Sequence, residues 1–179
     1  MKPQYAAASL LTILALSGCL GKNDSTDYTE WRKTNEAYVT TVQDSVSPQG
    51  TPLYTKVTPD WAPTAWIMMK WHNDRALTAS ALSPRDNSTV DVIYSLRNIN
   101  GTLIDSSWAR RDSIYRCRPC NNVVGFWRAL TEMHVGDHVT AVVPWTAGYG
   151  AFGSGSISPY TTLVFDIRLK AIEGFETPY

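Results

Sequence analysis

The sequence predicts an α+β fold that combines several short strands with one short helix. Three observations support this prediction. Apolar and more polar residues alternate over residues 90–96 and again over 163–169, which is the period of strands with one buried face. Between them, residues 126–133 place their apolar side chains three and four positions apart, which is the helical period. At residues 138–143 the period returns to two, so the helix is followed by a strand.

Length and composition limit the classes of protein to consider. The chain has 179 residues, 44% of them hydrophobic and 11% aromatic, which fits one globular domain with a real core. Lysine plus arginine and aspartate plus glutamate both number 16. Because basic residues are never more than paired along the chain, the sequence lacks the charge pattern of a nucleic-acid-binding protein.

The N-terminus is expected to be a targeting segment. Lys2 precedes an apolar run over residues 6–16 that is too short to cross a bilayer as a stable helix. The run ends in Leu16-Ser17-Gly18-Cys19, which resembles a bacterial lipobox, so residues 1–18 are expected to be a lipoprotein signal peptide. Cys19 would then carry the lipid that holds the protein at a membrane surface. An ordinary secretory signal is the alternative.

Residues 19–27 are small and polar and are expected to form a tether. Residues 28–43 are predicted to be a helix, because Trp31, Asn35, Tyr38 and Val42 share one face. Only part of that face is apolar. We expect the helix to dock on the main domain, and pairing with a second copy of itself is the alternative.

The middle of the chain is predicted to supply the first strands. Residues 66–71 (WIMMKW) are apolar on both faces, which indicates a central strand or one covered by the N-terminal helix. A shorter strand is expected near 54–57, and residues 78–87 are expected to be loop. Together, residues 28–87 form an N-terminal helix with an extension strand.

The next segment is predicted to be a hairpin. The strand at residues 90–96 points Tyr94 into the core, Asn98–Gly101 makes a turn, and residues 103–107 return from it. The connection 108–124 is expected to contain an edge strand near Ile114 to Arg116.

The last part of the chain completes the unit. The helix at 126–133 is followed by the strand at 138–143, which Pro144 ends because it has no amide to donate. A glycine-rich loop over residues 145–160 holds Tyr149 and leads into the final strand.

Three separated signatures, in the right order over residues 88–172, closely resemble the FKBP-type peptidyl-prolyl isomerases. They are Tyr94 with Gly101 and Ile104-Asp105-Ser106-Ser107; Val123 to Phe126 with Ala129-Leu130, Met133 and Val135-Gly136; and Tyr149-Gly150, Ile157, Pro159 and Thr162 to Asp166. The resemblance implies an antiparallel β-sheet wrapped around one short α-helix, with the isomerase domain at 88–179. The lipobox and the segment 28–43 further resemble FKBP-type lipoproteins of Bacteroides-like bacteria.

The resemblance also implies a function. Such a protein catalyses cis-trans isomerisation of X-Pro bonds in an apolar pocket and needs no cofactor and no metal. The catalytic residues would be Asp105, Tyr149, Tyr94, Phe126 and Phe165, and the substrate-binding residues Ile104, Val123, Ile157 and Ile114. The backbone N–H of Val123 would hold a substrate carbonyl, and Arg110 would pair with Asp105.

Two positions depart from the family pattern. Ile104 stands where an aromatic residue is usual, and Phe126 stands where tryptophan is common, although Trp127 next to it could be aligned there instead. The register between Asp105 and Val123 leaves open whether Ile114 or Tyr115 faces the pocket, because a slip of one residue exchanges the two faces of a strand.

The expected partners follow from the same resemblance. They are proline-containing polypeptides, with macrolide inhibitors as further ligands, and a membrane reached through the N-terminal lipid. The protein is expected in the bacterial cell envelope as a monomer or weak homodimer. A binding or chaperone module of the same fold, with weak or no isomerase activity, is the alternative function.

Two other patterns involve the cysteines and the histidines. Cys117-Arg118-Pro119-Cys120 has the spacing of a thioredoxin-like redox pair, but no βαβ pattern precedes a helix there, so a local disulfide is expected in an exported protein. The histidines His72, His134 and His138 are too dispersed in the sequence to indicate a metal centre.

Overall fold

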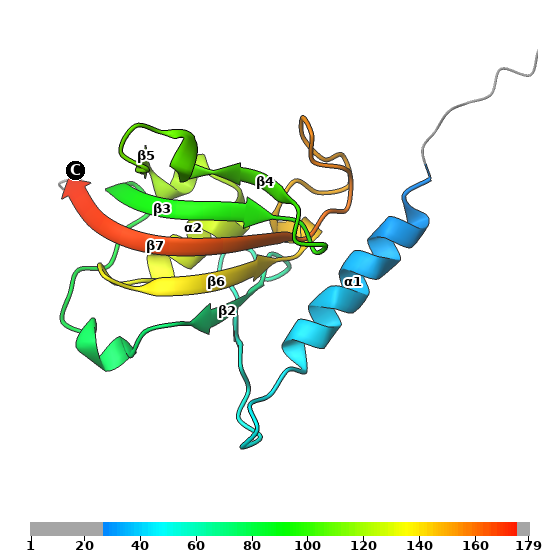
Figure 1. Cartoon of the computed structure of the whole chain (residues 1–179), viewed down its shortest axis with the longest axis horizontal. Coiled ribbons are helices and arrows are strands. Elements are labelled where there is room, and N and C mark those ends of the chain that lie inside the picture. The colour runs from blue at the N-terminus through cyan, green and yellow to red at the C-terminus, as the bar shows by residue number, and fades with distance from the viewer. Residues whose placement is uncertain (1–26, 175–179) are drawn as a thin grey trace, which may run out of the picture.

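The structure, a computed structural model, describes residues 27–174. Helix α2 packs against one face of a seven-stranded antiparallel sheet, and helix α1 lies on the other side (Figure 1). The helices and strands are α1 (Thr29–Gln43), β1 (Thr55–Val57), β2 (Ile67–Trp71), β3 (Thr89–Arg97), β4 (Leu103–Ser106), β5 (Tyr115–Cys117), α2 (Val124–Glu132), β6 (His138–Val143) and β7 (Leu163–Gly174). Short 3-10 helices span Arg75–Leu77, Ser107–Ala109, Pro119–Asn121 and Trp145–Ala147. The predicted α+β fold is confirmed.

The strands lie in the order β1-β2-β6-β7-β3-β4, and β5 also pairs with β3. Strand β4 pairs with residues 95–97 of β3, and β5 pairs with residues 90–92. The two short strands therefore share one edge of β3, and the connection between them leaves the sheet and returns to it. Because β2 lies in the same sheet as the later strands, the two expected parts, 28–87 and 88–179, are joined by one sheet, and the boundary between them stays a prediction.

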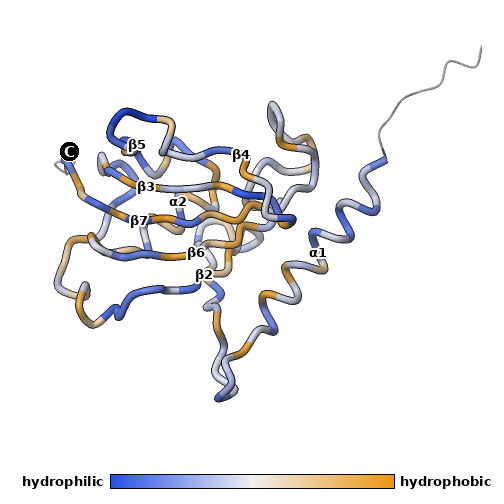
Figure 2. The backbone as a smooth tube through the Cα atoms, viewed as in Figure 1, coloured by the Kyte–Doolittle hydropathy of each residue, from blue (hydrophilic) through white to orange (hydrophobic). Residues whose placement is uncertain are grey.

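Alternation along the strands separates the two faces of the sheet, and Figure 2 shows apolar and polar segments following each other along β6 and β7. The inward residues form one core with the apolar face of α2, which contributes Phe126, Ala129, Leu130 and Met133. Helix α2 begins at Val124, two residues before the predicted start, because Val123 has extended backbone (φ −59°, ψ 146°) and serves as its N-cap.

Gly125 allows α2 to approach the sheet closely. A Cβ added at this position would lie 2.2 Å from Cγ1 of Val143 on β6. No side chain fits at that separation, so glycine is required where the first turn of the helix meets the sheet. This contact sets the depth at which the next residue, Phe126, is held.

Helix α1 docks on the face of the sheet opposite α2. Val39 and Val42 pack against Met68 of β2 and Val142 of β6 in a second, smaller core. The neighbouring residues of those strands face α2, which explains why β2 is apolar on both sides. The buried Asn35 accepts a hydrogen bond from the backbone N–H of Thr162 at 2.7 Å, so α1 also holds the start of β7. The structure thus has α1 docked, as expected.

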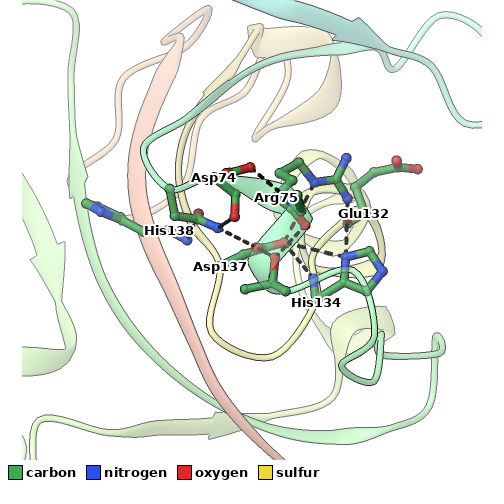
Figure 3. A network of polar contacts seen from close by, with 9 residues as sticks. Asp74, Arg75, Glu132, His134, Asp137 and His138 are labelled. Carbon is green, nitrogen blue, oxygen red and sulfur yellow. Dashed lines mark hydrogen bonds and ion pairs between the residues drawn. The ribbon is translucent and has the colours of Figure 1, made fainter.

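A buried carboxylate fixes the loop after β2 to the turn after α2 (Figure 3). Asp137 accepts hydrogen bonds from Asn73 Nδ2 (2.9 Å), Thr78 Oγ1 (2.5 Å) and the backbone N–H of His134 (2.8 Å). Burial alone would raise the pKa of this carboxyl, but the three hydrogen bonds, with Arg75 nearby, outweigh it and hold the pKa below its usual value.

The lipobox at residues 16–19 and most of the tether lie outside the described residues. Among residues 27–174, neither helix combines the length and apolar character needed to cross a bilayer.

Candidate active site

A pocket of about 460 Å³ opens between the N-terminus of α2 and the strands β3 and β7. It is lined by Tyr94, Leu96, Asp105, Tyr115, Asn121, Asn122, Val123, Phe126, Tyr149 and Phe165. Six of these ten residues were predicted as site residues from the sequence: Asp105, Tyr149, Tyr94, Phe126, Phe165 and Val123. Their side chains come from elements that are far apart in the sequence, and the fold brings them together.

Aromatic rings form the floor and walls of the pocket. Phe126 is 2% exposed and lies 4.9 Å from Phe165 and 5.7 Å from Tyr94, between ring centroids. The ring of Tyr115 meets Tyr94 edge-on at 5.4 Å. Tilted and edge-to-face contacts of this kind are favourable for aromatic pairs, so the rings hold one another in place. The result is a rigid apolar surface that can accept a small ring.

One carboxylate stands at the rim of this apolar surface. Asp105 accepts a hydrogen bond from the hydroxyl of Tyr94 through Oδ2, and another from the backbone N–H of Ser106 through Oδ1 (2.8 Å). Burial, and then the bond to Asp105, raise the pKa of Tyr94 well above its usual value. The hydroxyl therefore stays protonated at neutral pH and keeps donating to the carboxylate.

Two hydrogen-bond donors at the pocket are among those without a partner within residues 27–174. The backbone N–H of Val123 stands at the N-cap of α2, where helix amides point outward without intrahelical partners. The hydroxyl of Tyr149, on the loop before β7, is the other, and this side chain is 38% exposed. Both donors are available to a bound molecule.

Comparison with known proteins identifies the family. A sequence model described as "FKBP-type peptidyl-prolyl cis-trans isomerase" matches residues 81–170, half of the chain. The chain belongs to this FKBP family. An FKBP-type 22 kDa isomerase of Escherichia coli is 40% identical over 91 residues, which cover 50% of this chain and 43% of that protein. The isomerase Mip of Coxiella burnetii is 37% identical over 93 residues, covering 51% of this chain and 40% of that protein. The chain therefore matches less than half the length of these curated relatives.

Solved structures agree on the fold. An isomerase from Pseudomonas syringae pv. tomato superposes with a TM-score of 0.65 over 82% of this chain and 96% of that one, at 24% identity. FkpA of Escherichia coli superposes with a TM-score of 0.62 over 80% of this chain and 61% of that one, at 22% identity. At this identity the likeness shows the FKBP-like fold alone.

Three of the residues expected to bind substrate lie off the pocket of this FKBP-family domain. Ile104 and Ile157 pack against the core and line a neighbouring hollow of about 250 Å³ that also includes Trp31 of α1. Ile114 is half-buried and precedes β5. Strand pairing places Tyr115 on the pocket side instead, with its hydroxyl donating to Asn122 Oδ1 at 3.1 Å. Contact of the three isoleucines with substrate stays a prediction.

The structure also decides between Phe126 and Trp127, and it shows where Arg110 lies. Phe126 faces the sheet, whereas Trp127 points away, stacks on Trp61 and donates from Nε1 to Asp86 Oδ1 at 2.6 Å. Arg110 lies over the ring of Tyr115, 4.8 Å from its centroid, and forms no ion pair with Asp105 in the described part of the chain.

Sequence reasoning missed four lining residues or left them open: Leu96, Tyr115, Asn121 and Asn122. Leu96 shares the face of Tyr94 on β3, so the alternation that placed Tyr94 also contained this information. The two asparagines lie at the end of the 3-10 helix Pro119–Asn121, just before α2, in a stretch without periodicity, and no sequence signal placed them at the pocket.

The structure has Cys117 and Cys120 as separate thiols, and the expected disulfide between them stays a prediction. Cys117 ends β5 and packs against the core, and burial raises the pKa of its thiol to about 11. Cys120 lies in the following 3-10 helix and donates to Asn87 Oδ1 at 3.3 Å. A raised pKa suppresses the thiolate, which also argues against redox chemistry at Cys117.

A larger surface hollow of about 880 Å³ lies between α1 and the loop before β7. Arg32, Lys33 and Glu36 of α1 contribute to its lining, and it lacks the aromatic floor of the smaller pocket. Binding sites for small groups combine an apolar surface with a few converging polar groups, so the smaller pocket is the candidate active site.

Proposed function

We propose that this chain is a peptidyl-prolyl cis-trans isomerase that acts on X-Pro bonds of exported or envelope polypeptides. The observation that carries the proposal is the pocket itself. It joins an aromatic floor, a carboxylate held by Tyr94, and two unpartnered donors at Val123 and Tyr149. Membership of the FKBP family supports the same activity.

The reaction requires no covalent chemistry from the protein. Rotation about an X-Pro bond is opposed by amide resonance, with a barrier of about 18–20 kcal/mol, and takes tens to hundreds of seconds without a catalyst. No bond breaks. The twisted amide has lost resonance and is less dipolar than the planar one, so an apolar pocket shielded from water stabilises it more than the ground state.

Each part of the pocket has a role in this proposal. The proline ring lies on Phe126, between Tyr94 and Phe165. Tyr149 donates its hydroxyl to one substrate carbonyl and the N–H of Val123 donates to another, which fixes the peptide on both sides of the bond. Asp105 faces the twisting amide as the polar group of the rim, and its bond from Tyr94 keeps it in one orientation. None of these steps needs a metal or a cofactor.

The proposed location is the cell envelope, with Cys19 acylated and residues 20–27 as a tether, as in the FKBP-type lipoproteins that the N-terminal sequence resembles. The polar composition of residues 20–27 supports a role as spacer between lipid and domain. Macrolides that mimic a proline ring are proposed as inhibitors. We propose a monomer or weak homodimer, which the burial of Val39 and Val42 of α1 against the sheet supports.

A peptide assay tests the activity. The whole chain is added to a short proline peptide, and the rate of cis-to-trans conversion is followed. Tyr149→Phe and Asp105→Ala are each expected to lower kcat/KM about tenfold, which corresponds to about 1.4 kcal/mol of lost transition-state stabilisation.

Tyr160→Phe is the matched control, because Tyr160 is on the same loop but its ring packs on Trp145 rather than lining the pocket. It is expected to keep the wild-type rate. If the chain binds the peptide without accelerating the conversion, the proposed isomerase activity is wrong and the binding-module alternative replaces it.

A further inference from the structure

Three potential metal ligands lie together on the outer face of the sheet, although they are far apart in the sequence. His72 follows β2, His138 begins β6 and Asp166 lies in β7. The pairing of β2 with β6 continues by one residue, because the N–H of His72 donates to the carbonyl of His138 at 2.9 Å. The two imidazoles are therefore cross-strand neighbours.

The side chains converge within ligand distance. The rings of His72 and His138 are 4.5 Å apart between centroids, and Nε2 of His138 lies 2.8 Å from Oδ2 of Asp166. One ligand atom from each of the three residues lies within 4.8 Å of the other two. The dispersed histidines of the sequence are thus brought into a cluster of two imidazoles and one carboxylate, because β2, β6 and β7 are neighbours in the sheet.

We propose that His72, His138 and Asp166 bind one divalent transition-metal ion, with Zn²⁺ as the reference ion. Two imidazole nitrogens and a carboxylate oxygen suit this class of cation and leave an open position for water. The hard ions Mg²⁺ and Ca²⁺ prefer shells made of oxygen ligands, so they are expected to bind far more weakly.

The geometry needs only a small adjustment. Metal–ligand bonds of about 2.0–2.2 Å in a tetrahedron place ligand atoms about 3.3 Å apart. The pair His138 and Asp166, at 2.8 Å, is slightly closer than this and has to separate by a few tenths of an ångström, while the exposed ring of His72 has to move in. One nitrogen of that ring, Nε2, lies 2.8 Å from Oγ1 of Thr140, which can orient the ring while the other nitrogen binds the ion.

The charges around the site act in both directions. Burial and the neighbouring His138 lower the pKa of His72, so its imidazole is neutral near pH 7 and can act as a ligand. Lys70 and Arg168 also contribute to that lowering, and these two cations oppose the binding of a third. Asp166 is the anion that offsets them, so the carboxylate is required for binding as well as the histidines.

Binding would join β2, β6 and β7 on the face opposite the pocket. The next residues along β6 and β7, Val139 and Ile167, point into the core beneath α2. A metal that binds only the folded protein stabilises it. The site would therefore act as a clamp between β2 and the strands of the family-matched region.

The test is a Zn²⁺ titration of the whole chain at pH 7.5, followed by calorimetry and by the imidazole signals in NMR. The chain has three histidines, so His134 is an internal reference. The signals of His72 and His138 are expected to shift together and saturate at one ion per chain, while His134 does not follow them. Lowering the pH to 5.5 is expected to release the ion as the imidazoles become protonated.

Variants separate this site from other ligands. His138→Ala and Asp166→Asn are each expected to weaken binding at least about tenfold, in proportion to the loss of a ligand. His134→Gln is the matched histidine control, and a Cys19→Ser, Cys117→Ser, Cys120→Ser chain removes thiol ligands; both are expected to bind as the wild type does.

The proposal is overturned if His72 and His138 do not shift with Zn²⁺ or if binding survives in His138→Ala. It is equally overturned if binding disappears with the thiols. Any of these results would leave His138 and Asp166 as a simple surface pair.

Discussion

At the scale of single residues, the contact between Tyr94 and Asp105 organises the pocket. The hydroxyl of Tyr94 donates to the carboxylate, while its ring forms part of the apolar wall beside Phe126. One side chain therefore serves both the apolar and the polar part of the site. The raised pKa of Tyr94 keeps this donor available throughout the neutral range.

Tyr94→Phe separates these two contributions. The variant keeps the ring and removes the hydrogen bond, so Asp105 loses one of its two donors. We expect kcat/KM for a proline peptide to fall by about 10- to 100-fold, in keeping with a hydrogen bond to a charged group worth about 1.5–3 kcal/mol. The measurement is the isomerisation rate of variant and wild type.

Tyr38→Phe serves as the control for Tyr94→Phe, since Tyr38 packs in the second core on the other face of the sheet. An unchanged rate in Tyr94→Phe would mean that the orientation of Asp105 does not affect catalysis.

The sequence predicted Tyr94 and Phe126 correctly as inward-facing, because regular alternation and helical spacing assign a face without further information. It could not decide between Ile114 and Tyr115. The connection before β5 has no alternation of its own to fix the register, and only the pairing of Val92 with Tyr115 decides it. Similarly, the irregularity between Leu96 and Arg97 prevents counting across the hairpin from Tyr94 to Asp105.

At the scale of elements, the close packing of α2 on β6 sets the position of the pocket floor. Gly125→Ala is expected to destabilise the protein by about 1–3 kcal/mol, because the new Cβ overlaps Val143 and forces the helix outward. The free energy of unfolding in urea measures this effect.

Gly155→Ala is a useful comparison for Gly125→Ala. Gly155 has open space around its Cβ position but a positive φ of 54°, so any cost there comes from backbone strain and not from overlap. If Gly125→Ala leaves the free energy of unfolding unchanged, the close approach of α2 to β6 is wrong.

Asp137 provides a prediction at the same scale, for the loop that it fastens to the turn after α2. Asp137→Asn is expected to lower the free energy of unfolding by about 3 kcal/mol at pH 7, because three donors lose a buried anionic acceptor. The pKa of Asp137 is lowered in the folded state, so its contribution is present above the unfolded value near 3.8 and is lost as pH falls through the folded value.

The difference between wild type and Asp137→Asn should therefore shrink below about pH 4. Urea unfolding at several pH values measures it, with the exposed Asp60→Asn as control. A difference that stays constant down to pH 2 would show that the ionised carboxylate is not what stabilises the loop.

Most elements were predictable because they have clear periods. The start of α2 was placed two residues late, since Val124 and Gly125 continue the helix without adding to its apolar pattern. The cluster of His72, His138 and Asp166 was not predictable, because it depends on which strands are neighbours, and that order is not written in any local pattern.

At the scale of the whole molecule, the two faces of one sheet carry different elements. One face holds α2 and the pocket, and the other holds α1 and the histidine cluster. Helix α1 accepts hydrogen bonds from both ends of the loop region before β7: Glu36 accepts one from Trp145, and Asn35 accepts one from Thr162. The same loop region carries Tyr149. The segment before the family-matched region is therefore built into the domain and supports the lip of its pocket.

The central claim is that this pocket accelerates rotation about X-Pro bonds. The most direct measurement is NMR exchange spectroscopy of a proline peptide with the whole chain at a hundredth of the peptide concentration. We predict exchange cross-peaks between cis and trans forms that are absent without the protein and strongly reduced with Asp105→Ala. Exchange that stays at the uncatalysed rate with folded wild-type protein at micromolar concentration would contradict the account.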